Sequence, residues 1–195
     1  MLRAFLRLLF ILAFMFSAHF AAAGVVGSGA VSGTGARHMD SHEMTDFFSK
    51  IRTNPDFNPK DIPDLTVLNE YRQSYLQEAI AWRPSLADYL IDHGINIDNR
   101  DYKGATALQF ALAWKNYEIA KKLILKGANL SLRDKFGNDA LWTAVVPNCG
   151  NYEIVELLME NGSDPFVKNK AGRSVADIAE VMQNEKLKKL FGLPR

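Results

Sequence analysis

"LQEAIAWRPSLADYLIDHG" at residues 76–94 and "LQFALAWKNYEIAKKLILKG" at residues 108–127 are two near-copies of one pattern. Each copy ends in a glycine, and a third copy ends in the same way, so the series is Gly94, Gly127 and Gly162. A second glycine series runs in parallel through Gly104, Gly137 and Gly172. Both series are spaced by 33 and then 35 residues, which indicates a repeat with one short insertion before its third copy.

The insertion can be located by comparing two copies. "AWKNYEI" at residues 113–119 becomes "VVPNCGNYEI" at residues 145–154, so a loop is lengthened around 147–150. Irregular loops on a regular scaffold often carry binding specificity, which makes Pro147 and Asn148 candidate binding residues. Sequence drift without functional consequence is the alternative, and the sequence does not separate the two.

Each copy has the chemistry of a helical pair followed by a turn. Residues able to cap a helix stand at equivalent places before the first helix, namely Ser74, Thr106, Asp139 and Ser174. Small residues follow where two helices must approach closely, namely Ala79, Ala111, Ala144 and Ala179. The second helices carry apolar stripes, namely Leu86, Leu90 and Ile91, then Ile119, Leu123 and Ile124, then Ile154, Leu158 and Met159. One such unit cannot bury its own apolar face, so the copies are expected to stack.

The stretch before the repeat, residues 40–72, is predicted to be a helical region that caps the stack. Asp40 and Glu43 can start a helix, and Asn54-Pro55 can end it. The apolar face between them consists of Met44, Phe47, Phe48 and Ile51. A second short apolar helix is predicted from the spacing of Leu65, Val67, Leu68 and Tyr71.

The first 23 residues are typical of a secretory signal peptide. Arg3 and Arg7 precede the apolar run 8–16, and small residues end at Ala23, after which cleavage is expected. The run is too short to span a bilayer, so we expect no membrane insertion after cleavage and a periplasmic or secreted protein. A buried N-terminal helix is the alternative. Residues 24–39 are glycine-rich and are predicted to form a flexible leader.

Composition excludes several classes of protein. The formal net charge of the chain is +1 and becomes −1 once Arg3 and Arg7 are removed with the signal segment, so nucleic-acid binding is not expected. Cys149 is the only cysteine of 195 residues, which rules out an internal disulfide. His38 and His42 are four residues apart, but they lack further ligand-type neighbours and are interpreted as linker residues. We therefore expect no metal and no cofactor.

The segments "DYKGATALQFA" (101–111) and "DKFGNDALWTA" (134–144) open the repeat units, and "HGINI", "KGANL" and "NGSDP" close them. In this pattern the chain resembles the ankyrin-repeat family over about residues 72–192. The resemblance implies an all-α solenoid of stacked helix-turn-helix units with protruding turns, in units 73–100, 101–133, 134–168 and 169–195. Two departures suit terminal caps: Arg72 stands where the first unit lacks its glycine, and the last unit has a short second helix with lysines.

The resemblance also implies a non-catalytic module that binds one protein partner through a concave groove and its turn tips. The candidate contact residues are Trp82, Tyr102, Lys103, Trp114, Lys135, Phe136, Trp142, Pro147 and Asn148. Aromatic and basic residues of this kind are enriched in interface hot spots. Core packing is the alternative for the tryptophans, and for Trp142 the two readings are evenly balanced.

The mature chain contains no H-E-x-x-H, G-x-S-x-G or P-loop motif, so it is not expected to be an enzyme. The leading hypothesis is an exported, monomeric adaptor, in the form of an immunity-type inhibitor of a periplasmic toxin. The alternative within this class is a support protein for an exported oxidative-stress enzyme such as catalase. A hydrolase of envelope material and a structural spacer are the hypotheses from other classes.

Overall fold

The computed structural model describes residues 41–62, 64–146 and 151–194, and the chain from Ser41 onward forms one compact unit. Its helices in chain order are α2 (Ser41–Thr53), the 3-10 helix η1 (Pro59–Asp61), α3 (Tyr75–Trp82), α4 (Pro84–Asp92), α5 (Ala107–Ala113), α6 (Tyr117–Leu125), α7 (Ala140–Val145), α8 (Tyr152–Glu160), α9 (Val175–Val181) and α10 (Glu185–Leu190). Within the described ranges no strand forms, and the only β-type pairing is one isolated bridge between Leu68 and Ser74.

The four predicted capping residues start the first helix of each unit. The hydroxyl oxygens of Ser74, Thr106 and Ser174 and the carboxylate of Asp139 accept a hydrogen bond from the backbone N–H three residues on. Asparagines cap the second helices α6, α8 and α10 in the same way. The remaining second helix, α4, begins instead with Pro84, which suits a first helical position because its missing N–H would have no partner there.

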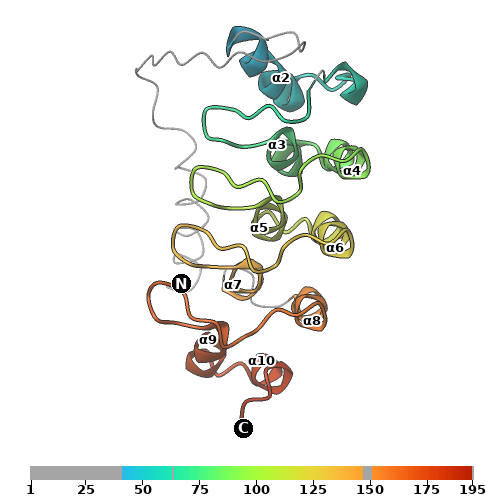
Figure 1. The fold of residues 1–195 in the computed structure, drawn as a ribbon. Coiled ribbons are helices and arrows are strands. Elements are labelled where there is room, and N and C mark those ends of the chain that lie inside the picture. The colour runs from blue at the N-terminus through green and yellow to red at the C-terminus, as the bar shows by residue number, and fades with distance from the viewer. Residues whose placement is uncertain (1–40, 63, 147–150, 195) are drawn as a thin grey trace, which may run out of the picture. The chain divides into compact units, whose positions relative to one another are not determined.

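The helical pairs are laid out in successive layers (Figure 1). The first helices α3, α5, α7 and α9 contact one another in that order, and the second helices α4, α6 and α8 form a parallel series. The turns that precede the first helices protrude on the opposite side from the second helices (Figure 1). This arrangement confirms the predicted all-α stack of helix-turn-helix units.

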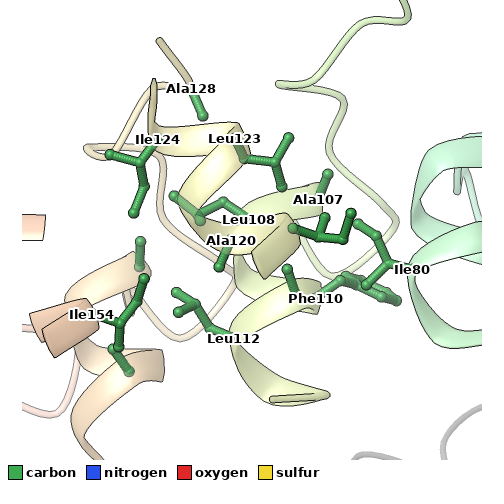
Figure 2. Packing of buried hydrophobic residues seen from close by; sticks show 14 of the residues in the cluster. Ile80, Ala107, Leu108, Phe110, Leu112, Ala120, Leu123, Ile124, Ala128 and Ile154 are labelled. Carbon is green, nitrogen blue, oxygen red and sulfur yellow. The ribbon is translucent and has the colours of Figure 1, made fainter. Parts of the chain in front are cut away.

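The core runs through the layers rather than around one centre. Figure 2 shows Leu108 and Leu112 of α5 packed with Leu123 and Ile124 of α6, with Ile154 of the next layer on one side. The four predicted small residues, Ala79, Ala111, Ala144 and Ala179, are all buried. Because each layer supplies apolar surface to both of its neighbours, no unit is expected to be stable alone.

Helix α2 covers the N-terminal end of the stack. Phe48 and Ile51 are buried, and the ring of Phe48 stacks on that of Tyr75 in α3 with centroids 4.3 Å apart. The guanidinium of Arg83 donates to the carbonyl oxygens of Asn54 and Pro55, both at 2.9 Å, which fixes the end of α2 to the first unit. The predicted roles of Asp40, Glu43 and Met44 concern side chains outside the described part of the chain.

The predicted short helix over Leu65–Tyr71 is wrong. This stretch forms turns, because the side-chain oxygen of Asn69 accepts hydrogen bonds from the backbone N–H groups of Tyr71 and Gln73, both at 2.9 Å. Such local side-chain bonds compete with a helix. The segment is instead the first member of the series of protruding turns. The predicted signal peptide 1–23 and leader 24–39 lie outside the described residues.

Candidate protein-binding surface

Four protruding turns in the described part of the chain share one construction. They span residues 69–73, 101–105, 134–138 and 169–173, and we call them the finger turns. Each begins with Asn or Asp. The side-chain oxygen of this residue accepts hydrogen bonds from the backbone N–H groups of the residues two and four positions later. For Asp101 these are the N–H groups of Lys103 and Ala105, both at 2.8 Å. The sequence therefore fixes each finger turn locally.

Adjacent finger turns are joined by backbone hydrogen bonds. The N–H of Tyr102 donates to the carbonyl of Tyr71 at 2.9 Å, that of Lys135 to Lys103 at 2.7 Å, and that of Lys170 to Phe136 at 2.9 Å. Neighbouring units are also tied through glutamine side chains, as when Gln77 Nε2 donates to the carbonyl of Ala105 at 2.9 Å. The finger turns are thus one connected row rather than independent loops.

The carboxylate of Asp101 is buried beneath its finger turn. Burial raises the pKa of Asp101, while hydrogen bonds from the Ala105 and Lys103 backbone act in the opposite direction. The pKa of Asp139 is likewise raised, because burial outweighs the opposite effect of the N–H groups in the helix that Asp139 caps. Both groups are engaged in holding backbone, so their shifted pKa values have a structural cause and do not indicate acid–base chemistry.

The finger turns present the predicted aromatic and basic residues. The side chains of Tyr102 and Phe136 are 47% and 58% exposed. The ammonium of Lys103 lies 5.4 Å from the Tyr102 ring centroid, and that of Lys135 lies 5.1 Å from the Phe136 ring centroid. Each pair offers a flat apolar face beside a positive charge, a combination suited to contact with another macromolecule.

The predicted tryptophans Trp82 and Trp114 lie together at the ends of their helices. Trp82 is the last residue of α3, and Trp114 caps the C-terminus of α5. Their rings are 6.4 Å apart, and their side chains remain 55% and 37% exposed. A helix of this length extends for about 12 Å, so the pair lies roughly that far from the capping residues next to the finger turns.

Trp142 has a different environment from the other two tryptophans. It is partly buried and packs against the core, three residues after the cap Asp139. In the two preceding units this place is held by Gln77 and Gln109, whose side chains bond to the next finger turn. The structure therefore favours a packing role for Trp142. The candidates Pro147 and Asn148 lie outside the described residues.

Several exposed apolar residues were missed in the sequence. Met182 caps α9 and is 46% exposed. It stands eight residues after the cap Ser174, as Trp82 and Trp114 stand eight after theirs, so alignment of the repeat would have found it. Tyr71 is a further partly exposed aromatic residue of the first finger turn, and its ring lies 5.7 Å from that of Tyr102. The prediction of a helix over residues 65–71 hides this position.

Metal-ligand clusters and membrane-spanning helices are both absent from residues 41–62, 64–146 and 151–194. Among these residues no group of three or more His, Cys, Asp or Glu side chains is placed to hold a metal ion. No helix within the same ranges has the length and apolar character needed to span a bilayer.

Comparison with known proteins agrees with the layered architecture. A family model for ankyrin repeats in three copies matches residues 54–134 and 76–169, which together make up more than half of the chain. The chain is 35% identical over 110 residues to the potassium channel AKT2/3 of Arabidopsis thaliana, covering 55% of this chain and 13% of the channel.

Two other relatives show the same partial overlap. An ankyrin repeat, SAM and basic leucine zipper domain-containing protein 1 of Ovis aries is 33% identical over 102 residues, which are 50% of this chain and 21% of the relative. A putative ankyrin repeat-containing protein of Treponema pallidum is 29% identical over 109 residues, which are 55% of this chain and 36% of the relative. The chain thus spans about a third or less of the length of these relatives. With the family model, the caps and the stacked layers in agreement, the chain belongs to the ankyrin-repeat family, whose repeats form a scaffold suited to binding other proteins.

Proposed function

We propose that the protein is an exported, non-catalytic module that binds one folded protein partner. The contact surface comprises the tips of the finger turns and the C-terminal ends of the first helices. The observation that carries the proposal is the exposure of Trp82, Trp114 and Phe136 on a framework whose finger turns are joined by backbone hydrogen bonds. Large aromatic side chains of this kind dominate the binding energy of many interfaces.

Rigidity of the framework supports this proposal. The finger turns are held by their own Asn and Asp side chains and by bonds between neighbours. The finger turns therefore lose little conformational entropy when a partner binds, and ordering of loops is otherwise a major cost of association. The stack uses the buried faces of its helices for folding, and the exposed aromatic side chains are left for another macromolecule.

The binding proposal is tested with alanine variants and a matched control. Protein partners are captured from the periplasm of the source cell with the wild-type chain, and affinity is measured by calorimetry. Trp114→Ala and Phe136→Ala should each weaken binding by about tenfold or more, which corresponds to about 1.4 kcal/mol. The control is Leu125→Ala, since Leu125 is 76% exposed on α6 among the second helices. Unchanged affinity of both aromatic variants, with the fold intact, would reject the surface assignment.

The proposed location is the periplasm, supported by the basic start, apolar run and small residues of the first 23 positions. Mass spectrometry of the protein recovered from the source cell tests this directly. We expect a mature N-terminus at Gly24 and recovery with the periplasmic fraction. An uncleaved chain recovered with the cytosol would contradict export.

Within this class, the finer role that we propose is an immunity-type inhibitor of a periplasmic toxin. A rigid binding module would act by covering its partner's surface, and export would bring it to the compartment where such a toxin acts. Adding the purified chain should then abolish the partner's activity at a stoichiometric ratio. Increased activity or stability of the partner would instead assign a support role, for an exported oxidative-stress enzyme such as catalase.

A further inference from the structure

Basic side chains gather in the last three finger turns and at the residue just before each of them. Residues 100–104, 133–137 and 168–173 hold seven basic side chains, which are Arg100, Lys103, Arg133, Lys135, Lys168, Lys170 and Arg173. We call this set the basic finger row. Asp101 and Asp134 are the only acidic residues in the three segments, whereas the whole chain has a formal net charge of only +1. Positive charge is therefore concentrated along one edge of the stack.

The two carboxylates of these segments are engaged within the turns. Asp101 is buried and accepts two backbone N–H groups. Asp134 accepts the N–H groups of Phe136 and Asn138 at 2.8 and 2.9 Å. Both carboxylates therefore use hydrogen-bonding capacity within their own finger turns.

The lysines of the second helices are in a different situation. Lys121 pairs with Glu153 at 2.6 Å, and Lys122 pairs with Asp88 and Asp92. By contrast, in the described part of the chain, Lys135 and Lys170 have no carboxylate oxygen within 4 Å, and both are exposed. Lys121 and Lys122 are thus paired with carboxylates, whereas in the described part of the chain Lys135 and Lys170 are not.

The members of the basic finger row are held next to one another. Backbone bonds join the finger of Lys135 to that of Lys103 and the finger of Lys170 to that of Phe136. The Arg100 guanidinium also donates to the carbonyl of Arg133 at 2.6 Å, which ties two fingers at their bases. The side chains of Tyr102 and Phe136 add exposed aromatic surface within the row.

We propose that the basic finger row docks an acidic protein surface that also offers apolar contacts. This inference rests on the proposed function and names the chemical class of its partner. Complementary charge orients the two proteins and speeds their encounter. The aromatic rings provide apolar surface that loses its water on contact. A protein partner is favoured over a nucleic acid because the repeats belong to a protein-binding scaffold and the chain as a whole is nearly neutral.

The test is an NMR titration of the purified protein with a short glutamate-rich peptide that contains phenylalanine. We expect amide shifts concentrated in the three basic finger turns, and we expect them to fade as salt is raised. A lysine-rich peptide of the same length should give none. Lys135→Glu combined with Lys170→Glu should weaken binding on the order of tenfold. The control, Lys60→Glu with Lys189→Glu, changes the net charge equally on exposed residues of η1 and α10, away from the finger turns, and should have little effect.

Equal weakening by both double variants, or shifts located away from the finger turns, would overturn the inference. Tighter binding of single-stranded DNA of matched charge than of the acidic peptide would also overturn it, in favour of a nucleic-acid partner. The titration needs no native partner. Its failure therefore removes the acidic-partner inference alone, while the alanine variants of Trp114 and Phe136 decide the proposed function separately.

Discussion

At the scale of single residues, the handedness of the backbone in the finger turns decides which side chains fit. Arg72 has φ +59° at the place where the next three finger turns have glycines with φ between +73° and +82°. A side chain in this left-handed region costs about 1–2 kcal/mol. The first finger turn therefore carries a strain that the others avoid.

Arg72→Gly should stabilise the protein. The gain in the free energy of unfolding is expected to be about 0.5–1 kcal/mol, since relief of strain is partly offset by the greater freedom of glycine in the unfolded chain. The carbonyl of residue 72, which accepts from Asn99 Nδ2 at 2.9 Å, is retained. Urea unfolding measures the difference. A net loss of stability would show that the Arg72 side chain contributes more than its backbone strain costs.

Gly137 and Gly172 form a matched pair for separating strain from crowding. Both have positive φ, but a Cβ on Gly137 would lie 2.8 Å from the backbone nitrogen of Lys170, whereas one on Gly172 would meet nothing within 4 Å. Gly172→Ala should cost about 1 kcal/mol from handedness alone. Gly137→Ala should cost roughly 2–3 kcal/mol, because the contact between fingers must also give way. Equal losses in urea unfolding would contradict this account of finger spacing.

At the scale of elements, one ion pair joins the capping helix α2 to the first unit. Arg52 Nε lies 2.7 Å from Glu78 Oε1, and the Glu78 side chain is only 8% exposed while that of Arg52 is 47% exposed. Removal of Arg52 would leave a buried carboxylate without a partner. We expect Arg52→Ala to lower the free energy of unfolding by about 1–2 kcal/mol, less than for a fully buried pair because Arg52 is half exposed. Adding Glu78→Gln to Arg52→Ala should restore most of the loss, and a double variant as unstable as Arg52→Ala would contradict this reading.

The same pair makes a signed prediction for pH. Burial raises the pKa of Glu78 in the folded protein, and Arg52 only partly opposes it. The folded state thus holds this proton more tightly than the unfolded state does. The contribution of Glu78 to stability is greatest below the ordinary glutamate pKa and declines as pH rises through the raised value. As pH rises from 4 to neutrality, the stability of Glu78→Gln should therefore increase relative to that of the wild type, as followed by thermal unfolding. A decrease in its relative stability over that range would contradict the raised pKa of Glu78.

Sequence reasoning succeeded for elements whose ends are set by local chemistry. Ser74, Thr106, Asp139 and Ser174 were expected as caps and are caps, because the bond from a side-chain oxygen to an N–H three residues on needs no tertiary context. The helix predicted over residues 65–71 is wrong because four apolar residues at short spacing are compatible with a helix and with a packed turn alike. Asn69 decides between them, and the missing glycine at Arg72 hid the finger turn.

At the scale of the whole molecule, the repeat register determines which side chains remain on the surface. It placed Trp82 and Trp114 correctly at helix ends, where both are exposed. It could not decide Trp142, because that residue occupies a place held by glutamines in the earlier units and its burial depends on packing between layers. The charge of the finger edge was also missed, since it emerges only when segments some 33 residues apart lie side by side.

The central claim is that successive helical pairs are laid out in layers and support one another. Ser85, Glu118, Glu153 and Lys186 each stand two residues after the cap of a second helix and are exposed, so they mark equivalent points in the four units. Spin labels are placed at Ser85 and at one of the other three positions in turn, with Cys149→Ser in each variant. Electron–electron distances should then increase with each layer, in steps of roughly 10 Å set by helix packing. Distances that fail to increase from Glu118 to Glu153 to Lys186 would show a chain wrapped around a single centre and would contradict the account.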